Sequence, residues 1–141
     1  MLKNIPSLIP PILLKIMCEM GHGDEIVLAD GNFPSERLGR KVVRLDGHGT
    51  CEILKAIISL FPLDTYAKEN AVLMKVVETD KTETPIWDEY DRILRQAEGD
   101  NLKKGFEERF AFYERAEKAY AVIATGEKAL YANLILKKGV L

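Results

Sequence analysis

The residue best suited to proton transfer is His22, one of only two histidines, which stands between two glycines in the stretch MGHGDEIVLAD. An imidazole titrates near neutral pH, so an accessible histidine can give or take a proton under physiological conditions. Gly21 and Gly23 let the backbone turn sharply and place no side chain beside the ring. The spacing indicates a general acid or base or, equally well, an imidazole that caps the carbonyl groups of the preceding helix.

Asp30 is the second candidate, because it follows the apolar run 26–29 and precedes the loop Gly-Asn-Phe-Pro. This pattern puts the carboxylate at the carboxyl end of a buried strand, the edge at which ligands of open α/β sheets bind. An aspartate can also start a turn there through its own side chain, which is common. Both interpretations remain open on spacing alone.

The stretch LYANLIL brings a tyrosine and an amide close together, at Tyr131 and Asn133. Its apolar residues predict a strand, and alternate residues of a strand share a face, so these two side chains should project together. A buried amide without partners costs about 1–3 kcal/mol. The pair therefore indicates either a site that hydrogen-bonds hydroxyl groups or a structural amide bonded across the sheet.

Arg109 and Tyr113 are four residues apart in EERFAFYERAEKA and share one face of a predicted helix, which Glu117 continues. A guanidinium offers several fixed donors to hydroxyl oxygens. The same spacing is typical of a solvated charged face whose aromatic neighbours, Phe110 and Phe112, pack on the core. On spacing alone the solvated face is the better interpretation.

A zinc site is the remaining chemical alternative, since Cys18-x₃-His22 and His48-x₂-Cys51 together supply two thiols and two imidazoles. However, Cys18 follows Leu14 by four residues on an apolar helix face, and Cys51 opens an apolar helix. We therefore expect buried, inert thiols and no metal. The sequence also lacks a P-loop, a G-x-G-x-x-G loop and a G-x-S-x-G elbow.

The composition predicts one ordinary globular domain. The chain has 141 residues, of which 47% are hydrophobic and 30% charged. A net charge of −2 with scattered basic residues argues against a nucleic-acid-binding face. The first residues, MLKNIPSLIPPILLKIM, lack the charge and the small-residue cleavage site of a signal peptide, and two cysteines suit a reducing compartment. No stretch approaches the roughly 20 apolar residues needed to span a bilayer, so we expect a soluble, cytoplasmic protein.

Helical and strand patterns alternate along the chain. Helices are predicted at 11–20, 51–61, with Thr50 as a cap, 86–97 and 106–119. Strands are predicted at 26–29, 41–45, 71–77, 119–124 and 129–139, the last two forming a hairpin around TGEK. Polar loops are predicted at 31–40, 79–85 and 98–105. Together these elements predict an α/β protein, a three-layer α/β/α sandwich with a mixed sheet and helices on both faces.

An ordered series of motifs runs along nearly the whole chain: MLKNIPSLIPPILLKIMCEMGHGDEIVLADGNFP, VVRLDGHG, FPLDTY, ERFAFYERAEKAYAVIATGE and YANLILKKGV. In this series the chain resembles the bacterial L-fucose mutarotase family, sister to the D-ribose pyranases. Only the middle, roughly 67–105, is weakly marked. Gly23 and the Asn-Phe-Pro at 32–34 favour the fucose branch, because pyranases tend to have His-Thr-Asp and Leu-Pro-Ile-Pro there.

The resemblance implies one sugar-mutarotase-like domain over residues 1–141, a ring-type homo-oligomer, often a decamer of two pentamers, and no metal or organic cofactor. It implies that His22 is the proton donor and that Tyr113 has a supporting role. The sugar-binding positions that match are Asp30, Arg109, Tyr131, Ala132 and Asn133. Two departures are mild: Ala132 stands where fucose enzymes often have glycine, and His48 occupies a variable position in DG-x-G.

The implied activity is interconversion of the α and β anomers of L-fucose through an open-chain aldehyde. His22 would protonate the ring oxygen, and Asp30 would accept sugar hydroxyls or serve as the complementary base. These two residues are eight apart, and a strand rises roughly 3.3 Å per residue, so their backbones should lie about 15–25 Å apart. We therefore expect one pocket to be shared between subunits, with His22 supplied by a neighbour. D-ribose pyranase and a non-catalytic sugar-binding or transport-associated module are the alternative functions.

Overall fold

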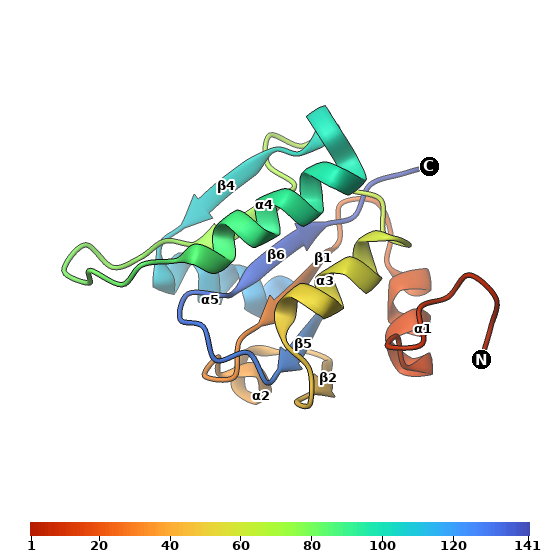
Figure 1. The fold of residues 1–141 in the computed structure, drawn as a ribbon, viewed down its shortest axis with the longest axis horizontal. Helices are drawn as coiled ribbons and strands as arrows, with labels where there is room; N and C mark the ends of the chain where they lie inside the picture. Colours follow the sequence, from red (N-terminus) through yellow and green to blue (C-terminus); the bar gives the residue numbers. More distant parts are fainter.

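The computed structural model describes residues 1–141 and places six strands in one sheet between two layers of helices (Figure 1). The strand order is β2-β5-β1-β6-β3-β4. The strands are β1 Glu25–Ala29, β2 Val42–Leu45, β3 Ala71–Met74, β4 Lys104–Glu107, β5 Ala121–Thr125 and β6 Leu134–Lys137. The helices are α1 Pro11–Glu19, α2 Ser35–Leu38, α3 Thr50–Ile58, α4 Pro85–Glu98, the 3₁₀ turn η1 Gly99–Asn101 and α5 Arg109–Lys118. The predicted α/β/α sandwich with a mixed sheet is confirmed.

The central strand β1 is buried on both faces, which explains its uninterrupted apolar sequence. Ile26 and Leu28 belong to the larger core, formed with α1, α3 and α4. Val27 and Ala29 face the other way and belong to the smaller core, formed with α2 and α5. Figure 1 shows α3 and α4 in front of the sheet and α5 behind it.

The strand directions determine which loops meet. Strand β6 is antiparallel to both of its neighbours, β1 and β3. The pairs β1–β5, β2–β5 and β3–β4 are parallel. The carboxyl ends of five strands therefore lie at one edge of the sheet, together with the start of β6. None of the helices has both the length and the hydropathy needed to cross a bilayer.

The predicted C-terminal hairpin is wrong, because β1 lies between β5 and β6. The chain leaves β5 at Thr125, and the regular strand resumes only at Leu134. Tyr131 has a left-handed backbone, with φ of 57°, so Tyr131 and Asn133 do not share a face of one strand as predicted. Leu130 of this stretch is 51% exposed, and Ala132 is buried although it lies outside the strand.

Strand β4 was missed by the sequence prediction, which assigned its residues to a loop and to the start of a helix. Its sequence, KGFE, contains one large apolar residue, and that residue, Phe106, is 50% exposed. An edge strand of this kind has no apolar pattern to identify it. The short helix α2 also lies inside a predicted loop, and β3 is shorter than predicted.

The start of α3 also differs from the prediction. Gly49, not Thr50, is the N-cap residue, and its N–H donates to Glu52 Oε1 at 3.0 Å. The Thr50 hydroxyl instead donates to Glu127 Oε2 at 3.1 Å, which connects α3 to the segment that follows β5.

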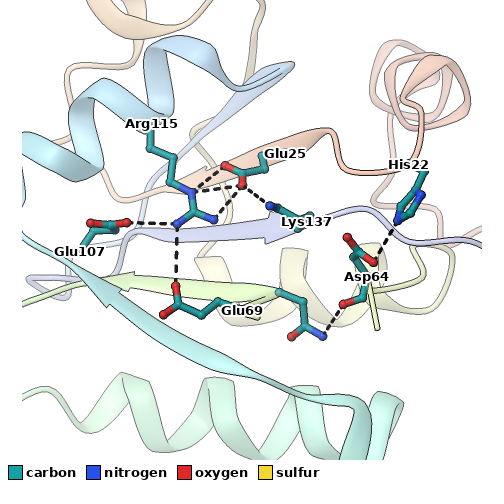
Figure 2. Close-up of polar contacts among 8 residues, drawn as sticks. His22, Glu25, Asp64, Glu69, Glu107, Arg115 and Lys137 are labelled. Atoms are coloured by element: carbon teal, nitrogen blue, oxygen red, sulfur yellow. Dashed lines mark hydrogen bonds and ion pairs between the residues drawn. The ribbon is translucent and has the colours of Figure 1, made fainter. Parts of the chain in front are cut away.

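Arg115 of α5 holds that helix against the sheet through a group of charged side chains (Figure 2). Its guanidinium donates to both carboxylate oxygens of Glu25, at 2.8 to 3.1 Å, and to Glu107 at 3.2 Å. Lys137 Nζ lies 3.4 Å from the same Glu25 carboxylate. Glu69 Oε2 is the third carboxylate near the guanidinium, 4.0 Å from Arg115 Nη1, and a Cβ on Gly105 would come within 2.2 Å of its carboxyl group and displace it.

Candidate active site

His22 lies in the turn between α1 and β1, and its imidazole is paired with a carboxylate. His22 Nε2 is 3.0 Å from Asp64 Oδ1 (Figure 2). The His22 side chain is 46% exposed, whereas that of Asp64 is only 7% exposed. His22 Nδ1 makes no hydrogen bond within the chain, so one ring nitrogen is held and the other remains available to a ligand.

The alternative role of His22, as a cap for α1, is filled by another residue. Lys138 Nζ donates to the carbonyl oxygens of Met17 at 2.7 Å and Met20 at 2.5 Å. The turn itself needs Gly23, whose φ is 85° and whose N–H donates to Lys138 O at 2.8 Å. The imidazole is therefore free of the helix end that precedes it.

Asp64 is the residue that the sequence reasoning missed. It stands in FPLDTY, a motif that contributed to the family resemblance but received no role. Burial favours the neutral carboxyl, but hydrogen bonds from His22 and from the N–H of Tyr66, at 3.0 Å, outweigh it and lower the pKa of Asp64 below its ordinary value. Asp64 is thus a charged partner for His22 at neutral pH.

Asp30 lies directly after β1, at the carboxyl end of the strand, as predicted, and is 5% exposed. Asn133 Nδ2 donates to Asp30 Oδ2 at 3.0 Å, and Asp30 N–H donates to Asn133 Oδ1 at 2.8 Å. The N–H of Asn32 donates to Asp30 Oδ1 at 3.0 Å, the turn-starting bond that was the alternative interpretation. Burial raises the pKa of Asp30, and these hydrogen bonds only partly oppose it.

The segment before β6 is held by helix α4. Trp87 Nε1 donates to Tyr131 O at 2.8 Å, and the Tyr90 hydroxyl donates to Ala132 O at 2.7 Å. The Tyr131 hydroxyl donates to Asp80 Oδ2 at 2.7 Å, which raises the pKa of Tyr131. The side chain of Tyr131 thus faces the connection between β3 and α4.

Arg109 and Tyr113 share a face of α5, as predicted, and Arg109 Nε donates to the Tyr113 hydroxyl at 3.2 Å. The ring of Tyr113 also packs edge-on against Phe33, with 5.5 Å between the ring centres. The positive charge of Arg109 acts on Tyr131 and partly opposes the rise in its pKa. A cavity of about 590 Å³ reaches Arg109, and one of about 300 Å³ reaches Asp30.

The candidate residues therefore form two groups. Asp30, Arg109 and the segment 131–133 lie at the edge where the parallel strands end. His22 lies at the opposite edge, before the start of β1. Asp64 lies there too, and its N–H donates to the carbonyl of Lys137, the last residue of β6, at 3.0 Å. The chain folds in a way that does not bring the two groups together.

The four possible zinc ligands do not assemble. His22 binds Asp64, and His48 Nδ1 lies 3.0 Å from Glu52 Oε1. No group of three or more histidine, cysteine, aspartate or glutamate side chains could hold a metal ion. Both cysteines are free, but Cys18 is exposed and Cys51 is only partly buried, which contradicts the predicted buried thiols.

Comparisons with known proteins agree on one family. The model of the RbsD / FucU transport protein family matches residues 3–141. The chain is 54% identical to the fucose mutarotase of Danio rerio, over 99% of this chain and 94% of that protein. FucU from Bifidobacterium longum is 57% identical with a TM-score of 0.95, and the two structures cover 99% of each other. The fucose mutarotase of Streptococcus pneumoniae, solved in complex with L-fucose, is 48% identical over 99% of both chains, also with a TM-score of 0.95.

Proposed function

The chain belongs to the RbsD / FucU transport protein family, and from that premise we propose that it is an L-fucose mutarotase. This enzyme is an isomerase that interconverts the α and β anomers of L-fucose. The observation that carries the proposal is the 48% identity, over nearly the whole of both chains, to a fucose mutarotase whose structure contains L-fucose.

The reaction needs only proton transfers. The ring oxygen gains a proton as the C1–O5 bond breaks, and the anomeric hydroxyl loses one. The open-chain aldehyde turns about C1–C2, and the same steps in reverse close the ring on the other face. Positioned acid or base catalysis of this kind contributes about 10²–10⁴-fold.

In the proposed site His22 is the proton donor, acting through Nδ1. Its Nε2 is held by Asp64 at 3.0 Å, so the carboxylate fixes the ring orientation and stabilises the imidazolium. Because Asp64 is buried and charged, it holds the ring without competing for the sugar. Asp64 thus joins the site as the partner of the acid.

The sugar-binding residues of the proposal are Asp30, Arg109, Tyr131, Ala132 and Asn133, with Tyr113 in support. Asp30 accepts hydrogen bonds from Asn32 and Asn133, yet each carboxylate oxygen has a second lone pair for a sugar hydroxyl. Arg109 supplies donors on a side chain that Tyr113 steadies. The amide of Asn133 orients the Asp30 carboxylate through two hydrogen bonds.

Catalysis is proposed to occur between subunits. His22 and Asp30 lie at opposite edges of the sheet, so a sugar bound at Asp30 needs His22 from another copy of the chain. A ring-type homo-oligomer, a decamer of two pentamers, supplies such neighbours, and the cytoplasm is the proposed compartment.

Saturation-transfer NMR on the anomeric protons of L-fucose and D-ribose tests the activity directly. Catalytic amounts of the protein should accelerate exchange between fucose anomers, and His22→Ala should abolish the acceleration while the sugar still binds. His48→Gln is the matched control, because the His48 side chain hydrogen-bonds only Glu52 and its replacement should leave exchange unchanged. Accelerated exchange of ribose alone would identify a ribose pyranase, and sugar binding without any acceleration would identify a binding module.

A further inference from the structure

Asn70 is a fully buried amide, 0% exposed, whose side chain is saturated with hydrogen bonds to main-chain atoms. Its Nδ2 donates to Asp64 O at 3.1 Å and to Asn101 O at 2.7 Å. Its Oδ1 accepts from the N–H of Lys103 at 2.8 Å. Burying an amide is costly unless all of its donors and acceptors are used, and here all three contacts are made.

The main-chain groups of Asn70 connect the same region to the sheet. The N–H of Asn70 donates to Lys103 O at 2.9 Å, and its carbonyl accepts from the N–H of Lys137 at 3.0 Å. Lys137 O in turn accepts from the N–H of Asp64 at 3.0 Å. Asn70 and Asp64 are therefore attached to the same residue of β6, and the amide of Asn70 spans the loop between them.

The loop that carries Asp64 is also held by Lys103, whose Nζ donates to the carbonyl oxygens of Thr65 at 2.5 Å and Ala67 at 3.2 Å, both beyond Asp64. Thr65, Tyr66 and Lys68 are exposed, so the side chains that follow Asp64 do not anchor it in the core. The Asp64 carboxylate must nevertheless face His22, whose ring is itself only partly covered. The bond from Asn70 is the one side-chain hydrogen bond to the main chain of Asp64 itself, whereas Lys103 holds the carbonyls of Thr65 and Ala67.

We infer that Asn70 is a positioning residue for the reaction: it holds Asp64 at the distance and orientation that align the imidazole of His22. This inference rests on the proposed function, in which His22 is the acid. Asn70 touches neither the sugar nor His22 and acts only through Asp64. A displacement of about 1 Å at a reacting group can cost up to 10²-fold in rate, so removal of Asn70 should lower turnover.

The alternative is that Asn70 only supports the start of β4 through Asn101 and Lys103. The two roles differ in what happens at His22. A support for β4 would affect stability and leave the imidazole of the folded protein unchanged. A positioning residue would change the state of the imidazole in protein that remains fully folded.

The test is Asn70→Ala, observed by ¹⁵N NMR of the histidine side chains. The spectra are recorded at a pH high enough for the imidazole to be neutral; in the wild type the Asp64 carboxylate then holds the ring proton on Nε2, so the two nitrogen shifts of His22 should be far apart. In Asn70→Ala they should move toward each other, as in Asp64→Ala, because the ring now samples both tautomers. His48, paired with Glu52, is the internal control and should not move. In the same variant kcat for L-fucose should fall at least tenfold, with KM within about twofold.

Ile57→Val, a core change in α3, controls for lost stability, because Ile57 is fully buried in a helix that contains none of His22, Asp64 and Asn70. If it moves the His22 shifts as much as Asn70→Ala does, the effect is structural and the inference is wrong. Unchanged His22 shifts in folded Asn70→Ala would also overturn it. Should Asn70→Ala fail to fold, Asn70→Leu takes its place, since it has nearly the same volume and loses both donors. The NMR result stands even if the wild type fails to accelerate anomer exchange, in which case only the proposed function is lost.

Discussion

His22 and Asp30 lie at opposite ends of strand β1, separated by all five of its residues. At roughly 3.3 Å per residue the strand alone spans about 17 Å, which exceeds the width of one sugar ring. The separation was predicted from residue count, and the structure agrees with it. The acid and the binding carboxylate of the proposed site therefore work together only if two copies of the chain meet.

Asp64→Asn should lower the mutarotation rate while leaving sugar binding nearly intact. The amide keeps the shape of the carboxylate but not its charge, so it no longer stabilises a protonated His22. We expect kcat for L-fucose to fall about 10–100-fold, with KM within about threefold. Saturation-transfer NMR over a range of fucose concentrations separates the two constants. A variant with wild-type kcat would show that Asp64 does not assist the acid.

The two buried carboxylates should give opposite dependences of stability on pH. The pKa of Asp30 is raised above its ordinary 3.8, so ionisation of Asp30 destabilises the folded state. This loss of stability is absent below pH 3.8 and complete above the folded pKa. Asp64 has a lowered pKa, so its contribution is present above 3.8 and lost as pH falls through its folded pKa. Relative to wild type, Asp30→Asn should gain stability and Asp64→Asn lose it as pH rises from about 3 to 7.

Chemical denaturation at a series of pH values measures both differences. In Asp30→Asn the lost hydrogen bond with Asn133 shifts the whole curve but not its slope, because an amide does not titrate here. Parallel curves for wild type and Asp30→Asn would mean that burial does not penalise the Asp30 charge. The same slope for both variants would contradict the opposite assignments.

Continuous apolar runs made the central sheet predictable, whereas the contacts that complete the site were not. IVLA predicts a doubly buried strand, and Asp30 at its end follows directly. Strand β4 and the left-handed Tyr131 have no local pattern, since an exposed edge and a tertiary packing constraint determine them. Asp64 is 42 residues from His22, and a pair this distant leaves no spacing signal in a single sequence.

Tyr131→Phe should weaken sugar binding more than it affects the fold. The hydroxyl donates to Asp80 and accepts from the N–H of Val77, both on the connection after β3, and all three residues are at least partly exposed. We expect stability to change by less than about 1 kcal/mol. KM for L-fucose should rise about tenfold with kcat little changed, since one neutral hydrogen bond is worth about 1.4 kcal/mol or less. Steady-state anomer exchange measures KM, and an unchanged value would exclude the Tyr131 hydroxyl from binding.

Arg115→Met should lower the free energy of unfolding by about 2–3 kcal/mol. This loss is somewhat smaller than the loss caused by removing one partner of a fully buried ion pair. Glu25 is 13% exposed and would keep only Lys137 as a counter-charge. Methionine keeps most of the aliphatic packing, so the loss reports the charge. Urea denaturation measures it, and Arg92→Met is the control, because Arg92 forms only an exposed pair with Glu89. Equal losses in the two variants would show that the Glu25 group contributes no more than a surface pair.

Two inactive variants should restore activity when they assemble together, provided that each site uses residues from two chains. His22→Ala removes the acid and Asp30→Asn removes the binding carboxylate, so each homo-oligomer should be inactive. Co-expressed mixed oligomers contain some pockets in which His22 comes from one chain and Asp30 from the other. If each pocket draws these residues from two different chains of a random equal mixture, about a quarter of the pockets are intact, and activity should return to about a quarter of wild type. Mixing the purified homo-oligomers without subunit exchange is the control and should remain inactive. If both residues acted from the same chain, every chain in the mixture would lack one of them, and no mixed oligomer could regain activity.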